Sequence, residues 1–146
     1  MSTPLSIDDP DGLSAQLADI AEFCVAEAAR LGASASDVGV TSSTGLSVTV
    51  RMGEVETIEH IRDKGLGVTV YFDHRKGSAS SSDFGRAALT STVEAACAIA
   101  RHTGEDEYSG LADASRMASV FPDLDLYHPI DLGADDAIDL AIRADN

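Results

Sequence analysis

The stretch from Arg51 to Asp83 constrains the fold of this chain more than any other segment. Apolar and polar residues alternate there with period two, and turn signals that contain glycine separate the alternating runs. The clearest run has apolar residues at Leu66, Val68, Val70 and Phe72. Because successive side chains of a β-strand point to opposite faces of a sheet, this pattern predicts strands with one buried face.

The connections between the predicted strands are short. Turn signals at 43–45, 52–53, 63–65 and 73–77 separate the successive runs. Short gaps favour antiparallel neighbours, because parallel strands need a long crossover connection. Runs near 38–40, 46–50, 54–61, 66–72 and 78–82 therefore predict a meander of four to five strands.

Two segments have the helical period instead. From Leu13 to Leu31 apolar residues recur at steps of three and four, with Asp11 as the expected N-cap and Gly32 suited to the position after the C-cap. A second helix is predicted from Arg86 to Arg101, with Asp83 able to cap its start. The predicted fold class is α+β, an antiparallel meander sheet of four to five strands flanked by two helices.

The sequence suggests three parts. Residues 1–12 are expected to be a flexible tail, 13–104 an α+β N-terminal domain, and 105–146 an irregular connector followed by the start of a further helix near Asp135. Because that helix has no recognisable C-cap before Asn146, we expect the natural protein to continue.

Charge limits the partners. The net charge is −15, with 25 acids against 10 bases. Such a field repels nucleic acid and anionic membranes. No apolar run approaches the roughly 20 residues that cross a bilayer, and the N-terminus lacks the features of a secretory signal. We expect a cytoplasmic protein that binds neither nucleic acid nor membrane.

Catalytic motifs are missing from the sequence. The histidines at 60, 74, 102 and 128 form no HExxH motif, and no GxSxG elbow is present. The Lys64–Gly67 segment precedes a predicted strand rather than a helix N-terminus, which argues against a phosphate site. Cys24 and Cys97 lie in alanine-rich helical patterns typical of buried thiols. We therefore predict no catalytic residue, no metal ligand and no cofactor in this chain.

The least negative part of the chain offers candidates for contact with a peptide or a partner protein. Between Arg51 and Thr103 acids and bases balance, so a carboxylate would favour this region. The candidate contact residues are Arg51, Arg75, Lys76 and Ser80. Solvated turn positions are the more common explanation of such bases, since exposed ion pairs are usually weak. The serine-rich run is a plain edge strand or, alternatively, an edge where an extended peptide adds as a further strand.

Four phrases follow one another in the chain: STGLSVTVRMGEVETIE, GLGVTVYFDHRKGSASSSD, TVEAACAIARHTGEDEYSGLAD and FPDLDLYHP. In this order they resemble the N-terminal region of the PmbA/TldD family, most closely its PmbA branch, also called TldE. The resemblance runs from about Leu13 to the end of the chain. It implies a longer cytoplasmic protein that works in a TldD–TldE-type heterodimeric metalloprotease on unfolded or extended peptides.

The resemblance also says where the chemistry would lie. The family's zinc motif, HExxxH, belongs to the TldD branch and lies beyond the region that this chain matches. The resemblance therefore implies a fragment that is inactive by itself, with zinc in a catalytic partner subunit. The implied partners are a TldD-like subunit or a second copy, and a peptide substrate. A free-standing peptide- or protein-binding module and a regulator associated with nucleic acid or gyrase are the alternatives.

Overall fold

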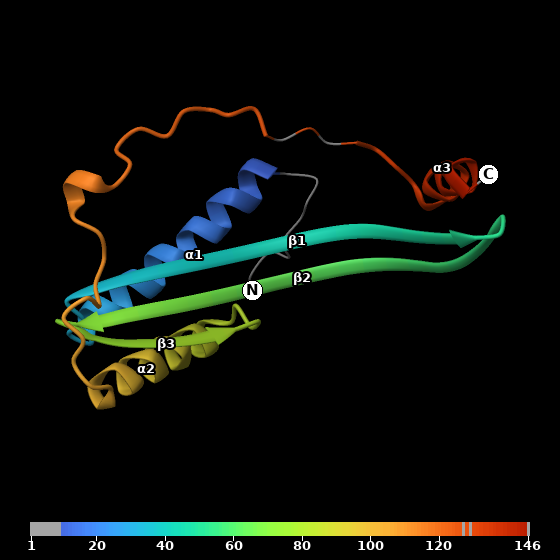
Figure 1. The fold of residues 1–146 in the computed structure, drawn as a ribbon. Coiled ribbons are helices and arrows are strands. Elements are labelled where there is room, and N and C mark those ends of the chain that lie inside the picture. The colour runs from blue at the N-terminus through green and yellow to red at the C-terminus, as the bar shows by residue number, and fades with distance from the viewer. Residues whose placement is uncertain (1–9, 127, 129, 146) are drawn as a thin grey trace. The chain divides into compact units, whose positions relative to one another are not determined.

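The computed structural model describes residues 10–126, 128 and 130–145. Three strands form one antiparallel sheet in the order β1-β2-β3, with helices before and after it in the chain (Figure 1). The elements are α1 (Pro10–Arg30), β1 (Ala35–Arg51), β2 (Glu54–Phe72), β3 (Arg75–Ser81), α2 (Arg86–His102), a 3₁₀-helix (Ala114–Arg116) and α3 (Ala134–Asp145). The predicted α+β class is confirmed.

The predicted number of strands is wrong, because the sheet has three strands rather than four or five. The turn signals at 43–45 and 63–65 lie inside the long strands β1 and β2. Asp63 Oδ1 does accept a local hydrogen bond from Lys64 N–H at 2.9 Å, yet the strand continues. Pairing between the two strands satisfies the backbone along their length, and this outweighs a local turn preference.

The chain divides into two compact units, which are described separately. One contains residues up to Ser42 together with Asp63–Ala114, and the other contains Ser43–Arg62 with Ser115–Asn146. Strands β1 and β2 pass through both units. The predicted domain boundaries at residues 12 and 104 stay predictions. Of the tail expected at 1–12, residues 1–9 lie outside the described residues and residues 10–12 lie in α1.

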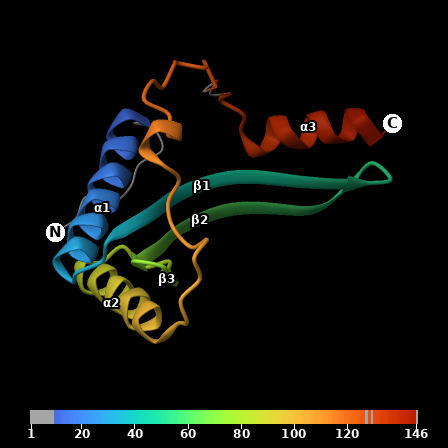
Figure 2. The ribbon, with the colours of Figure 1, turned by 60° about the vertical axis from the view of Figure 1, so that its left-hand side comes forward.

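The first unit contains the hydrophobic core. Alternate β2 residues Leu66, Val68 and Val70 are at most 2% exposed and face both helices. The core also contains Cys24 and Ala28 of α1 and, from α2, Leu89, Val93, Ala96, Cys97 and Ala100. Full burial of a valine or leucine side chain stabilises a fold by about 1.5–3 kcal/mol. The two helices thus cover one face of this part of the sheet, as the predicted fold requires (Figure 2).

Gly77 lets β3 lie directly against α2. A Cβ atom built at this position would lie 2.2 Å from the Ala96 carbonyl oxygen and 2.4 Å from Ala100 N. No side chain fits in that space, because real Cβ contacts are longer. The polar loop predicted for 73–77 is therefore wrong beyond the two-residue turn Asp73–His74, and the strand begins at Arg75.

Residues at the two ends of α1 explain where this helix begins and where it ends. The helix begins at Pro10, which suits a first helical position, so Asp11 lies within the helix and is not its N-cap. At the other end Gly32 has φ 90°, Gly32 N–H donates to Ala29 O at 3.0 Å and Ala33 N–H to Ala28 O at 3.1 Å. This is a Schellman motif, and it confirms the predicted role of Gly32.

The N-cap of α2 differs from the prediction. Gly85 occupies that position and makes no side-chain cap bond. Asp83 Oδ1 instead accepts a hydrogen bond from Gly85 N–H at 2.8 Å. Asp83 therefore orders the turn before the helix, because its carboxylate reaches only two residues along the chain.

The second unit has a looser structure. A two-residue turn joins β1 to β2, with φ 55° at Met52 and 77° at Gly53, the signs of a type I′ hairpin turn. Gly53 N–H donates to Asp145 Oδ2 at 2.7 Å, which ties the turn to the end of α3. No described residue of this unit is buried, and Val55, Ile58 and Ile61 are 41–51% exposed. Among the described residues, no helix is both long and apolar enough to span a membrane.

Candidate functional site

The structure brings together three of the four candidate contact residues. Arg75, Lys76 and Ser80 lie on β3 in the first unit, whereas Arg51 lies at the end of β1 in the second unit. The strand is seven residues long and pairs with β2 from Leu66↔Ser81 to Phe72↔Arg75. Strand β3 is therefore the candidate site.

Arg75 forms an ion pair with another residue of the chain. Its Nη2 donates to Glu105 Oε1 at 2.9 Å. Asp106 N–H donates to His74 O at 3.0 Å beside it, so residues 105–106 are fixed to the β2–β3 turn. An exposed pair of this kind contributes little to stability, typically about 0–1 kcal/mol. Its effect here is to neutralise Arg75, which is a weaker candidate for a peptide carboxylate than the sequence suggested.

Lys76 and Ser80 share one surface. Side chains of β3 alternate, so that Gly77 and Ala79 face the helices while Lys76, Ser78 and Ser80 are exposed on the opposite face. On that face Ser78 Oγ lies 3.0 Å from Thr69 Oγ1 of β2. The surface is made of small polar side chains with one ammonium group at one end.

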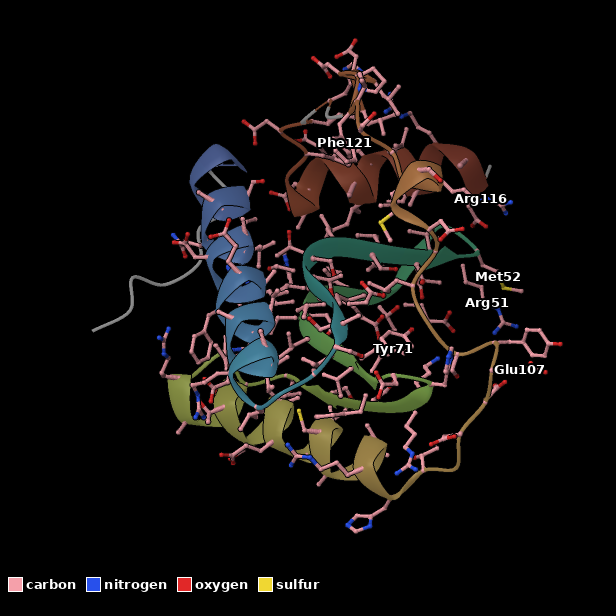
Figure 3. All side chains as sticks on the ribbon, turned by 90° about the vertical axis from the view of Figure 1, so that its left-hand side faces the viewer. Arg51, Met52, Tyr71, Glu107, Arg116 and Phe121 are labelled. Carbon is pink, nitrogen blue, oxygen red and sulfur yellow. The ribbon has the colours of Figure 1, made fainter. Side chains whose placement is uncertain are left out.

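Arg51 belongs to a different surface. It projects from the β1–β2 turn next to Met52, whose side chain is 85% exposed (Figure 3). Its Nη1 lies 3.8 Å from Glu56 Oε1, with both side chains largely in solvent. Arg51 is a solvated turn residue in the second unit and does not add to the β3 surface.

The described residues do not fit a zinc site. No group of three or more His, Cys, Asp or Glu side chains converges among them. His128 Nε2 lies 3.9 Å from Asp125 Oδ2, at the limit of an ion pair and without a third ligand. Zinc needs three or four protein ligands in tetrahedral geometry. We therefore derive no catalytic step through a metal on this chain.

The two cysteines are core residues. Cys24 and Cys97 are both fully buried in the first unit. Burial raises the pKa of each thiol above its ordinary value of 9.0; nearby Arg86 and Arg101, respectively, oppose that shift. A protonated buried thiol is a poor nucleophile, and this agrees with the interpretation of both residues as small apolar side chains.

Two features of the β3 surface were not foreseen from the sequence. Glu105 pairs with Arg75 across 30 positions, and no local pattern signals so distant a partner. Ser78 sits between Lys76 and Ser80 on the same face, and the period-two rule applied to residues 76–80 would have found it. The described structure thus offers an edge strand with polar groups, and no catalytic cluster.

Comparison with known proteins matches this region to one family. Residues 36–100 match the first domain of the PmbA/TldA metallopeptidases. The chain belongs to the PmbA/TldD family. The matched residues run from the start of β1 through most of α2, so family membership rests on the sheet and the helix that covers it.

Similar proteins in this family are larger. The chain is 47% identical to the metalloprotease PmbA of Escherichia coli O157:H7 over 129 residues, which is 86% of this chain and 29% of that protein. It is 45% identical to a metalloprotease PmbA homologue of Haemophilus influenzae over 130 residues, 89% of this chain and 29% of the relative. The chain thus spans less than a third of these curated relatives and corresponds to their N-terminal region.

Solved structures show the same fold. A Bacteroides thetaiotaomicron protein described as a modulator of DNA gyrase matches with a TM-score of 0.66 and 25% identity over 77% of this chain and 24% of that one. TldE from Thermococcus kodakarensis matches with a TM-score of 0.59 and 15% identity. The match covers 76% of this chain and 25% of the TldE chain. At 15% identity the second match shows the fold alone.

Proposed function

We propose that this chain is the N-terminal part of a PmbA/TldE-like subunit of a TldD–TldE-type metalloprotease that acts on unfolded or extended peptides. The observation that carries the proposal is the 47% identity to a protein named metalloprotease PmbA, which extends over 86% of the chain. Identity at this level over most of a domain supports a shared role for that domain within its larger protein.

In this proposal hydrolysis belongs to the full-length complex. Zinc is held by a catalytic partner subunit, as the resemblance to the PmbA branch implies. The described residues of this chain contain no group of three metal ligands. The chain contributes the framework of the first unit and a surface for a TldD-like subunit or a second copy. It is inactive by itself.

A free-standing binding module is the second candidate. The edge strand β3 favours it, because Lys76, Ser78 and Ser80 are exposed and none of them is an apolar residue that needs to be covered. The two candidates differ in one property: a binding module would capture peptides as an isolated chain, and no larger assembly would be needed for its function.

The proposal also covers compartment and partners. We place the protein in the cytoplasm and expect no binding to nucleic acid or membrane. The net charge of −15 supports the exclusion of nucleic acid, because a phosphate backbone is repelled by such a field. A gel-shift measurement at low salt tests this, and tight DNA binding would contradict it.

Peptide cleavage tests the proposal directly. The 146-residue chain, the full-length protein that contains it, and that protein mixed with a TldD-like subunit are each incubated with a quenched fluorescent peptide. We expect turnover only in the mixture, and loss of turnover when zinc is chelated. Replacing the glutamate of the HExxxH motif in the partner by glutamine gives the matched inactive control.

Two outcomes separate the candidates. Robust cleavage by the 146-residue chain alone would contradict the proposal. A chain that binds peptides with measurable affinity, while the mixture shows no cleavage of any peptide tested, would favour the binding module.

A further inference from the structure

Residues 117–132 carry most of the exposed large apolar side chains of the second unit. This segment, the apolar connector, lies between the 3₁₀-helix and α3, and its described residues form no helix or strand. Single exposed apolar residues are normal on a folded protein, whereas a series of them within one short segment indicates a surface that another element covers. The exposed large apolar residues of the connector, 45–84% exposed, are Met117, Val120, Phe121, Leu124, Leu126, Ile130 and Leu132.

The backbone of the apolar connector is also largely unpaired. Leu132 N–H donates to Ile130 O at 3.0 Å, and Asp125 N–H donates to Asp123 Oδ1 at 2.9 Å. The other described backbone groups of the connector make no hydrogen bond within the described part of the chain. Segments with few hydrogen bonds and few buried apolar contacts have low local stability. The described residues of this chain therefore do not hold the connector in a packed structure.

The sequence of the connector separates apolar from acidic positions. Leucine or isoleucine occupies positions 124, 126, 130 and 132, whereas aspartate occupies positions 123, 125 and 131. Successive side chains of an extended backbone point to opposite sides, so this spacing gives one apolar side and one acidic side. In this chain Asp125, with φ 50°, interrupts the extended backbone. An apolar surface could cover the first side and leave the aspartates in water.

The exposed apolar residues of the first unit are scattered by comparison. Val25 lies on α1 and Ile99 on α2, while Tyr108 and Leu111 follow α2. Tyr108 is the closest counterpart of Phe121, because these two aromatic side chains are 87% and 84% exposed and both lie outside helices and strands (Figure 3). The pair therefore allows a matched comparison between the two units.

The length of the relatives indicates what covers the connector. The chain aligns with the N-terminal region of two PmbA proteins and covers 29% of each, so most of each relative lies outside the aligned region. The connector follows the matched first domain, which ends at residue 100. In a full-length protein the polypeptide beyond α3 is thus tethered near this segment. Tethering favours an intramolecular contact over contact with a separate molecule.

We propose that the apolar connector is an intramolecular docking segment. In the full-length protein its leucine, isoleucine and phenylalanine side chains pack against an apolar surface of the polypeptide that follows α3, and this contact orders the connector. A second copy is a weaker occupant, because each chain carries a charge of −15 and the aspartates of two connectors would repel one another. The inference rests on family membership and goes beyond the proposed function, since it concerns the assembly of one polypeptide and involves no hydrolysis.

Hydrogen exchange followed by mass spectrometry tests the proposal on the full-length protein. That protein and the 146-residue chain are each exchanged alone, without a TldD-like subunit, and peptides from residues 117–132 are compared. We expect the connector amides to exchange almost unprotected in the 146-residue chain and about a hundredfold more slowly in the full-length protein. Because the contact is intramolecular, the protection should not change over a roughly tenfold range of protein concentration.

Serine substitutions provide the matched variants. In the full-length protein Phe121→Ser should make the connector amides exchange about tenfold faster, whereas Phe121→Leu keeps an apolar side chain and should retain most of the protection. Tyr108→Ser should leave exchange of the connector unchanged. In the 146-residue chain both serine variants should unfold at the wild-type temperature, because the side chains they remove are largely in solvent. A circular dichroism melt verifies that each variant folds.

Four results would overturn the proposal. Equal exchange of the connector in the two wild-type proteins would show that nothing in the full-length chain covers it. Protection that rises with protein concentration would assign the surface to a second copy, and protection that needs a TldD-like subunit would assign it to that partner. Unchanged protection in a folded Phe121→Ser protein would remove the apolar contact from the explanation. Since no cleavage is measured, failure here leaves the protease proposal to its own assay.

Discussion

The two ends of strand β2 have similar apolar sequences and very different surroundings. Near its C-terminal end Leu66, Val68 and Val70 are 2%, 1% and 0% exposed, whereas Val55, Ile58 and Ile61 toward its start are 41–51% exposed. The buried residues lie in the unit where α1 and α2 form a second layer. A run of β-branched residues therefore becomes a core only where another layer covers one of its faces.

The second unit has fewer buried apolar contacts than the first. A two-stranded hairpin is marginal in water unless another element packs on it. Apolar residues of α3 at 137, 138, 141 and 142 are only partly buried, as are Leu46, Val48 and Val50 of β1. The predictions below compare matched substitutions in the covered part and the exposed part of the chain.

Glycine substitutions should give the largest contrast. Gly77→Ala places a Cβ 2.2 Å from the Ala96 carbonyl oxygen, so backbone must shift, and we expect the free energy of unfolding to fall by about 3 kcal/mol. Gly45→Ala in the exposed part of β1 meets no atom within 4 Å and should be neutral or stabilise by about 0.5 kcal/mol. Urea denaturation measures both; equal effects would mean that β3 does not pack closely on α2.

Valine truncations test the same contrast with identical chemistry. Val68→Ala removes two methyl groups from a residue that is 1% exposed, and we expect a loss of about 2 kcal/mol from transfer and cavity terms. Val55→Ala changes a residue that is 41% exposed and should cost about 0.5 kcal/mol or less. If thermal unfolding showed similar losses for both, some contact must bury Val55 in solution.

The buried thiols make the stability of the native state depend on pH, and both thiols lie in the first unit. Burial raises the pKa of Cys24 and Cys97 above 9.0, so above that pH an unfolded chain loses these protons while the native chain keeps them. The native state then binds more protons, and its stability should fall as the pH rises above about 9.

Chemical reactivity and pH titration check this expectation. At pH 8 iodoacetamide should label native Cys24 and Cys97 slowly and the unfolded chain rapidly. The alkaline loss of stability should be shallower in Cys97→Ala than in the wild type. Rapid labelling of the native chain would show that the first unit opens readily.

Ion pairs should give the smallest effects. Arg75→Gln removes a 2.9 Å pair with Glu105 and should cost about 0.5 kcal/mol, less at high salt. Arg51→Gln removes a 3.8 Å pair with Glu56 and should have no measurable effect. A double-mutant cycle at low and high salt measures both coupling energies, and a larger value for the Arg51 pair would reverse the expected order.

Much of the fold could be predicted because its signals are local. The period of three and four residues from Leu13 to Leu31, the glycine at 32 and the alternation at 66–72 depend on a few neighbours each, and all correspond to observed elements. The strand count failed at 43–45 and 63–65, where turn-forming residues continue in the strand because cross-strand pairing satisfies the backbone. Asp83 failed as an N-cap because the N-cap position is Gly85, two residues further along, and the Asp83 carboxylate bonds only the Gly85 N–H.

The candidate site was only partly predictable, because some of its properties depend on residues that are distant in the sequence. Lys76 and Ser80 were found from composition, and their common face follows from the period of a strand. That Arg75 is neutralised depends on Glu105, and that Arg51 lies in another unit depends on how far β1 extends. Such long-range relations leave no trace in a short window of sequence.

By itself the sequence determined the α+β class, the two core helices, and the segment from Arg51 to Asp83 as β-structure, because hydrophobic periodicity and turn chemistry act over a few residues. It also carried the family resemblance. Only the tertiary structure decided that two turn signals lie within continuous strands and that β3 has an open edge. It also decided that position 77 must be glycine, because the backbone of α2 leaves no room for a side chain there. These properties depend on which backbone and side-chain groups meet across the fold, and sequence spacing does not specify that.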